Sequence, residues 1–255
     1  MSMTREERRI SANEKFKKFA IELAENSAQV MEKDKSKKGV LLCEGTKESM
    51  DMYIYSRIYP EFIIAPAGGC TDIRRLMPFM HKYFEYQVFG LIDRDNCSKR
   101  MIRNLEKMEG VYCTKLPFIE NILCCPEVIK LIAIECGKDA SEVLKRVRKG
   151  LTSLLVDKMS LLNPFNIDLP EDKEVQIVSV SIITKSRAVH KTIDLSNVMY
   201  TFRDKAIVSQ VADAMDFRGR ENYYKFLKEQ IEGIRGEKIL LAIAKYLPEI
   251  QYSEF

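Results

Sequence analysis

Short apolar runs alternate with longer amphipathic stretches along the first half of the chain. The apolar runs are Gly39–Cys43, Phe62–Ala65, Gln87–Ile92 and Val111–Leu116, and their length is typical of strands that are buried on both faces. Apolar residues at helical spacing fill the intervals at about residues 46–58, 70–84 and 98–110. Strands that alternate with single helices predict an α/β fold with a parallel sheet of about four strands and right-handed crossovers.

Local sequence signals predict where several helices begin and end. Ser11-Ala-Asn-Glu14 has the form of a capping box and predicts the start of a first helix. Pro78 lies inside the helix at 70–84, where it is expected to kink or shorten that helix. Ser98 can cap the helix that Gly110 then closes.

The second half of the chain has a different pattern. Residues 119 to about 162 and residues from about 195 to the end predict helices, and residues 174–182 alternate as a strand does. We therefore expect an N-terminal helix and connector over residues 1–38, an α/β core over 39–130 and a mainly helical part over 131–255.

Composition excludes some classes of protein. With 46% hydrophobic residues in 255, the chain can bury a core, and a net charge of +4 is too small to indicate a nucleic-acid binder. Seven cysteines without a Cys-x-x-Cys pair, and only two histidines (His81 and His190), argue against zinc and for reduced thiols. No apolar run nears the ~20 residues that span a bilayer, and the charged N-terminus lacks a signal-peptide pattern, so we expect a cytoplasmic protein without membrane contact.

Three acidic residues follow predicted strands. Glu44 ends the first apolar run, and Asp93 and Asp95 follow the third. Ligands of open α/β sheets bind at the carboxyl ends of strands, and side chains two apart on an extended segment point the same way. Asp93 and Asp95 can therefore bind one cation, and Glu44 joins them if the first and third strands are neighbours. Oxygen ligands of this kind suit Mg²⁺ or Mn²⁺.

Further residues extend this candidate site. Glu48 would add a carboxylate one helical turn after Glu44, which allows a second metal. Gly68-Gly69 would let a phosphate backbone approach closely. Glu120 is a candidate metal or outer-sphere residue, or an acid that stabilises a helix N-terminus. Basic residues at the starts of the flanking helices could hold phosphates; they are Arg74, Arg75, Lys99, Arg100 and Arg103.

Each of these residues also has a plainer interpretation. An isolated Asp-x-Asp is most often a solvated loop, a Glu-Gly after a strand is common turn chemistry, and basic residues on a helix are most often a solvated face. The combination favours a site, because both acidic motifs end apolar strands in the order that the fold requires.

At these residues the sequence resembles the Toprim superfamily. The similar segments are Leu42-Cys-Glu-Gly-Thr-Lys-Glu48, Pro66-Ala-Gly-Gly69 and Gly90-Leu-Ile-Asp-Arg-Asp95. Glu-Gly-x-x-Glu resembles the form found in OLD-family nucleases. Leu116-Pro-Phe-Ile-Glu-Asn-Ile-Leu123 with Pro126-Glu-Val is similar to a Toprim-like family that includes the nuclease subunit of PARIS anti-phage defence. The resemblance covers about residues 39–130.

The resemblance implies a role for each residue. Glu44 would be the general acid/base, Asp93 and Asp95 would bind Mg²⁺, and Glu48 and Glu120 would complete the site of a Toprim-like core. The implied protein is an Mg²⁺-dependent endonuclease, a toxic effector that cleaves RNA, with transfer RNA as a target. An ABC-type ATPase partner would hold and release it; the chain has no Walker A sequence of its own.

Other functions stay open on the sequence. One is a DNA nuclease of the OLD type, and another is a non-catalytic Toprim module that binds a partner. A topoisomerase would need a tyrosine nucleophile on a strand-passage domain, for which this chain is too short. The helical half has more apolar surface than a four-stranded core needs, which predicts a homodimer of the free protein or contact with the ATPase.

Overall fold

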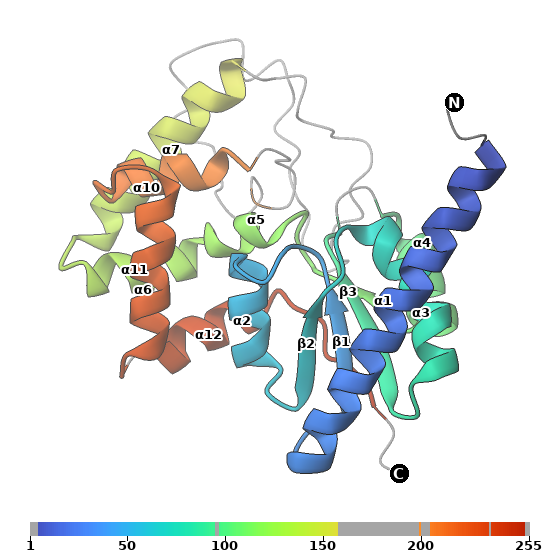
Figure 1. Ribbon diagram of the computed structural model, residues 1–255. Helices are drawn as coiled ribbons and strands as arrows, with labels where there is room; N and C mark the ends of the chain where they lie inside the picture. The colour runs from blue at the N-terminus through green and yellow to red at the C-terminus, as the bar shows by residue number, and fades with distance from the viewer. Residues whose placement is uncertain (1–4, 95–96, 158–198, 200–204, 235, 253–255) are drawn as a thin grey trace. The chain divides into compact units, whose positions relative to one another are not determined.

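The computed structural model describes residues 5–94, 97–157, 199, 205–234 and 236–252 of the chain. These residues fall into two compact units. The sheet unit comprises Met1–Ile92, Ile102–Cys113 and Glu249–Phe255, and the helical unit comprises Asp93–Met101 and Thr114–Pro248. Figure 1 shows the helices and strands of both.

A four-stranded parallel sheet forms the centre of the sheet unit. Its strands are β1 (Gly39–Cys43), β2 (Phe62–Pro66), β3 (Gln87–Ile92) and β4 (Val111–Cys113), in the order β2-β1-β3-β4. Every residue of β1 is buried, as expected for a strand that is covered on both faces. The predicted α/β fold is confirmed, and two of the four predicted strands have the predicted bounds.

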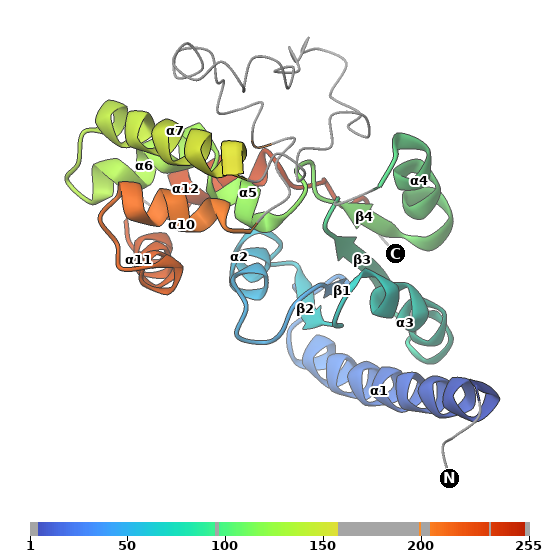
Figure 2. The ribbon, with the colours of Figure 1, turned by 90° about the horizontal axis from the view of Figure 1, so that it is seen from above.

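Helices cover both faces of this sheet. Figure 2 shows α2 (Met50–Ile58) on one face and α3 (Cys70–Tyr83) on the other, with α1 (Arg5–Lys33) beyond α3. The crossover from β1 to β2 and the crossover from β2 to β3 run in opposite directions across the sheet. Because both are expected to be right-handed, α2 and α3 lie on opposite faces. The buried stripe of α3 consists of Ile73, Leu76, Met77 and Met80.

The local signals for helix ends had mixed outcomes. The Ser98 hydroxyl accepts a hydrogen bond from Met101 N–H at 3.3 Å ahead of α4 (Lys99–Asn104), and Gly110 closes the π-helical turn η1 (Leu105–Glu109) at φ +64°. Both predictions are confirmed.

The prediction that the first helix starts at Ser11 was wrong, and of the two expected effects of Pro78, a kink or a shortened helix, the shortening is not seen. Helix α1 begins at Arg5, so Ser11 is inside it; a Ser-x-x-Glu spacing fits a helix interior as well as a cap. Helix α3 runs through Pro78 without being shortened. Pro78 is exposed, so water can satisfy the carbonyl oxygen that its missing N–H leaves open.

The helical unit packs six described helices around one another. Helix α6 packs on α7 and α12, and α10 packs on α5, α7 and α11. The fully buried Tyr223 donates its hydroxyl proton to the carbonyl oxygen of Leu123 at 3.1 Å, which ties α11 to α5. The helices are α5 (Ile119–Leu123), α6 (Pro126–Glu135), α7 (Ala140–Asp157), α10 (Ile207–Ala214), α11 (Arg220–Glu232) and α12 (Gly236–Ala244).

The two units divide the chain differently from the predicted domains. Helix α1 belongs to the sheet unit because it packs on α3, and residues 114–130 belong to the helical unit through α5 and α6. The strand expected at residues 174–182 lies outside the described residues. Across the described part of the chain, every helix is too short or too polar to cross a membrane.

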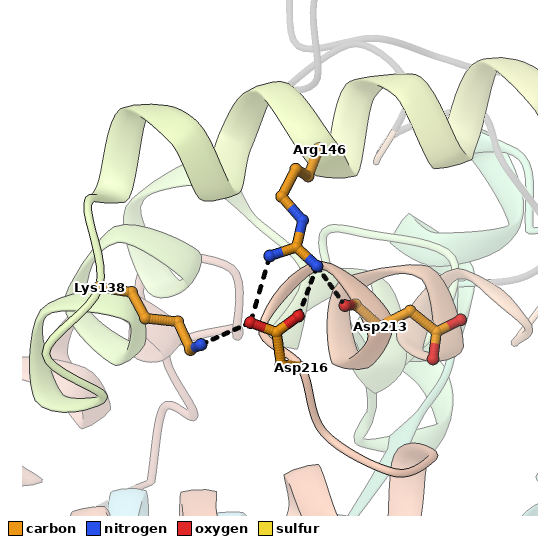
Figure 3. A network of polar contacts seen from close by, with 4 residues as sticks. All are labelled: Lys138, Arg146, Asp213 and Asp216. Atoms are coloured by element: carbon orange, nitrogen blue, oxygen red, sulfur yellow. Dashed lines mark hydrogen bonds and ion pairs between the residues drawn. The ribbon is translucent and has the colours of Figure 1, made fainter.

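A charged network joins α7 and the turn before it to the end of α10 (Figure 3). Asp216 accepts hydrogen bonds from Arg146 Nη2 at 2.6 Å and Nη1 at 3.2 Å, and from Lys138 Nζ at 2.6 Å. Arg146 Nη2 also donates to the carbonyl oxygen of Asp213 at 3.0 Å. The hydrogen bonds from Arg146, and to a smaller extent the one from Lys138, hold the pKa of Asp216 well below its usual value. The network therefore links α7, and the turn before it, to the end of α10.

Asp216→Asn should lower the melting temperature at neutral pH, because it removes the charge that two cations contact. Asparagine tolerates the left-handed backbone at this position, where φ is +62°. A lowered folded-state pKa gives stability that is present above the unfolded-state pKa of about 3.9 and is lost as pH falls below it. Thermal unfolding followed by circular dichroism should show the gap between wild type and variant closing below about pH 4. A gap that stays constant down to pH 2 would contradict the ionic explanation.

Candidate active site

The strand order places β1 and β3 at a topological switch point. The chain leaves β1 toward β2 on one side and returns through α3 to β3 on the other side of β1. In parallel sheets, ligands bind beyond the carboxyl ends of the two strands where the order reverses. Glu44 directly follows β1, and Asp93 directly follows β3. The condition on which Glu44 was expected to join the aspartates, neighbouring first and third strands, is met.

Two glycines shape the edge of the sheet beside Glu44. Gly45 N–H donates to the carbonyl oxygen of Gly68 at 3.0 Å, and Ala67 N–H donates to that of Cys43 at 2.9 Å. Gly45 and Gly68 have φ of +102° and +86°, a region that residues with a side chain rarely adopt. A Cβ at Gly68 would lie 2.7 Å from Asp72 Oδ2. Glycine is therefore required where the turns after β1 and β2 meet.

Two acidic residues that the sequence did not single out lie at the same edge of the sheet unit. A Cβ placed on Gly45 would lie 3.1 Å from Asp51 Oδ2, and the Asp72 carboxylate lies beside Gly68. Burial, and then the charges of Asp51 and Glu44, raise the pKa of the Cys43 thiol to about 12. The edge therefore carries carboxylates from the first turns of α2 and α3 as well as from Glu44. An acid in the first turn of each helix was the available signal.

The start of α3 is already occupied by one of these acids. Asp72 Oδ2 accepts a hydrogen bond from Gly69 N–H at 3.4 Å. The carboxylate thus faces a helix N-terminus, which otherwise attracts anions such as phosphate. Phosphate binding at Gly68 and Gly69 remains a prediction, but the negative charge of Asp72 weighs against an anion at the first amides of α3.

The segment after β3 has a well-defined backbone setting within the helical unit. Arg94 N–H donates to Thr114 Oγ1 at 3.0 Å, and Arg94 Nη1 donates to the carbonyl oxygen of Lys115 at 3.4 Å. Cys97 N–H closes a turn on the Arg94 carbonyl oxygen at 2.7 Å. Asp93 is half-buried, whereas Asp95 lies outside the described residues. The side chain of Arg94 is directed to the segment after β4.

Glu48 has a setting that the sequence did not predict, whereas Glu120 lies in the first turn of a helix, which was one of the two placements expected for it. Helix α2 begins at Met50 with Ser49 as its cap, so Glu48 is exposed in the preceding turn. The spacing of one helical turn from Glu44 is therefore wrong. Glu120 lies in the first turn of α5, and its Oε1 pairs with Lys205 Nζ at 3.1 Å. Its Oε2 is buried and has no hydrogen-bond partner among the described residues.

The candidate phosphate-binding side chains lie on exposed helix surfaces. Arg74, Arg75, Arg100 and Arg103 are exposed, and the guanidinium of Arg75 lies 5.8 Å from the Phe16 ring centroid of α1. Lys99 begins α4, but its side chain is not among those described. His81 is exposed on α3, and His190 lies outside the described residues. Arg75 thus has a packing contact within the sheet unit.

The donor atoms are of the type that Mg²⁺ or Mn²⁺ prefers. Glu44 and Asp93 each offer carboxylate oxygens directly after a strand of the sheet, and such hard oxygen donors fit these cations better than zinc. Within the described residues, no group of three or more His, Cys, Asp or Glu side chains is placed to hold a metal ion. This finding does not extend to the predicted group of Glu44, Asp93 and Asp95, because Asp95 is outside the described residues. None of the seven cysteines, all of which are among the described residues, forms a disulfide bond.

The chain was compared with protein-family models, with curated proteins and with solved structures, and none of them matched. The candidate site therefore depends on the geometry described above and on the sequence resemblance.

Gly68 and Gly69 are adjacent but differ in backbone conformation, so they allow a matched test of the turn after β2. Gly68→Ser should destabilise the protein by about 1–2 kcal/mol, because a side chain at positive φ is strained and its Cβ meets Asp72. Gly69→Ser should change stability by less than about 0.5 kcal/mol, because Gly69 has φ −105° and open space around its Cβ. Urea unfolding followed by circular dichroism measures both. Equal losses in the two variants would contradict this account of the turn.

Proposed function

We propose that this chain is a metal-dependent phosphodiester hydrolase, a nuclease whose substrate is RNA. The supporting observation is the strand order, which places Glu44 and Asp93 after the two strands of the switch point. Nearby carboxylates, from Asp51 and Asp72, add negative charge to the same edge of the sheet unit. Carboxylates that lie close together repel one another, and a bound divalent cation relieves this repulsion.

The proposed division of labour follows the chemistry of each group. When bound, Mg²⁺ or Mn²⁺ would supply a Lewis acid that polarises the scissile phosphate. Asp93 and Asp95 would hold the cation, with Glu48 and Glu120 as additional candidates. Glu44 would move a proton to or from the reacting oxygen, because it directly follows β1 and precedes the turn at Gly45.

The biological setting that we propose rests on the Toprim-like resemblance. It is that of a cytoplasmic, toxic effector of anti-phage defence that cleaves RNA such as transfer RNA. An ABC-type ATPase would hold the chain until infection, and the free chain would form a homodimer. RNA cleavage distinguishes this proposal from a DNA nuclease of the OLD type, and any cleavage distinguishes it from a non-catalytic binding module.

Glu44→Gln should retain metal binding and lose cleavage by ~10²–10⁴-fold, because glutamine keeps the size of glutamate but cannot take up a proton. Glu85→Gln is the matched control, since Glu85 is exposed just before β3, at the opposite end of the strand from Asp93. Purified proteins are incubated with transfer RNA, single-stranded DNA or duplex DNA, with Mg²⁺, Mn²⁺ or EDTA. Growth of bacteria at equal protein level gives a second measurement, in which Glu44→Gln should relieve toxicity. Cleavage and toxicity unchanged in Glu44→Gln would favour the binding-module alternative.

Asp93→Ala should weaken Mn²⁺ binding by roughly tenfold or more. Loss of a residue that only hydrogen-bonds to a metal ligand already lowers metal affinity ~10–100-fold, and Asp93 is proposed as a ligand itself. Folding should be retained, because the substitution removes one carboxylate from a like-charged edge. Isothermal titration with Mn²⁺ and a thermal melt measure the two effects. Asp213→Ala, at an exposed position of α10, is the control for loss of a carboxylate elsewhere. Normal cleavage by Asp93→Ala, with the same metal dependence, would show that the metal lies at another site.

A further inference from the structure

A single buried hydroxyl holds the main chain at the residue between Asp93 and Asp95. Thr114 follows β4 directly and is 1% exposed. Its Oγ1 accepts the Arg94 N–H at 3.0 Å and donates its proton to the Leu116 carbonyl oxygen at 2.7 Å. Because its one proton is committed to Leu116, the hydroxyl must present a lone pair to Arg94. Its orientation is thereby fixed.

The contact at Arg94 also fixes the peptide group that joins Arg94 to Asp93. The N–H of Arg94 and the carbonyl of Asp93 lie in one peptide plane, so anchoring this N–H restricts the main chain at Asp93, and hence where its carboxylate begins. The Cys97 N–H to Arg94 carbonyl bond of 2.7 Å adds a second anchor on the same residue. The contact from Arg94 Nη1 to the Lys115 carbonyl oxygen, at 3.4 Å, adds a third.

The segment that holds Arg94 is itself fixed to the helical unit. Lys115 N–H donates to the Tyr246 carbonyl oxygen at 2.8 Å, and Lys115 Nζ donates to the Lys245 carbonyl oxygen at 2.7 Å. Both acceptors lie just after α12, where helix carbonyl groups lack partners within the helix. The anchor of the aspartate segment thus extends through Thr114 and Lys115 to the end of α12.

We propose that Thr114 is a positioning residue for Asp93 of the metal site, a proposal that rests on the proposed function. Thr114 need not touch the metal or the substrate. Its hydroxyl holds the Asp93–Arg94 peptide so that the Asp93 carboxylate can bind a divalent cation. Partners that orient metal ligands typically contribute ~10–100-fold to metal affinity.

The test uses the full chain and Mn²⁺ alone, measured by isothermal titration. Thr114→Val keeps the shape of threonine but removes the hydroxyl, and should raise the Mn²⁺ dissociation constant ~10–100-fold. Thr114→Ser keeps the hydroxyl and should bind within roughly threefold of wild type. Tyr223→Phe is the matched control, because it also removes a buried hydroxyl bond of the helical unit, that to Leu123, and should leave Mn²⁺ affinity unchanged.

The outcomes separate the two proposals. Wild type that binds no Mn²⁺ would overturn the proposed metal site. Wild type that binds Mn²⁺ while Thr114→Val binds equally well would overturn the role of Thr114 alone. Equal weakening by Tyr223→Phe and Thr114→Val would show that only the stability of the helical unit matters. Should Thr114→Val fail to fold, Thr114→Cys replaces it, since a thiol is a weak hydrogen-bonding group. Affinity equal to that of wild type in the cysteine variant would also overturn the proposal.

Discussion

Parallel pairing of β1 with a strand on each side is the constraint from which the candidate site follows. β1 is hydrogen-bonded to β2 and β3 along its whole length, with Cys43 opposite Pro66 on one side and Leu91 on the other. A strand that is buried on both faces and paired on both edges cannot shift its register without exposing apolar residues or breaking ladder bonds. The register therefore fixes which residues follow the strands at one edge.

Acidic residues at that edge serve the local structure and the charge of the site together. Asp72 caps α3 at Gly69, and Asp51 lies in the first turn of α2, where a helix favours negative charge. Asp51 lies beside Gly45 and Asp72 lies beside Gly68, so both carboxylates are close to the turns that follow β1 and β2. Burial is the main cause of the raised pKa of Cys43, and the negative charges of Asp51 and Glu44 add to it. The negative charge of this edge suits a cation and disfavours an anion at the start of α3.

The aspartate segment depends on a different kind of interaction. Strand β3 ends at Ile92, and Arg94 makes hydrogen bonds to Thr114 through its main-chain N–H and to Lys115 through its side chain. Hydrogen bonds inside a buried segment are costly to lose, because each leaves a donor or acceptor without a partner. Directional bonds of this kind can set a carboxylate more narrowly than apolar packing can. The register of the sheet thus determines which residues lie at its edge, and hydrogen bonds determine the path of the main chain at Arg94.

Much of the sheet unit could be predicted from local patterns. The bounds of β1 and β3, the Ser98 cap and the Gly110 helix end depend on apolar period and turn chemistry, which adjacent residues determine. The positions of Glu44 and Asp93 after apolar strands could be read in the same way. Glu48 could not be placed, because the sequence does not show whether α2 begins at the turn or at Met50.

Only the tertiary structure decided which distant residues meet. The neighbourhood of β1 and β3, the pairing of Glu120 with Lys205 and the anchoring of Arg94 by Thr114 each join residues far apart in the chain. Local periodicity carries no information about such contacts, since it reports which face of an element is apolar and not what covers it. The sequence by itself determined the elements and the carboxylates that end them. Packing and register decided which strand ends are neighbours and which hydroxyl holds the chain beside Asp93.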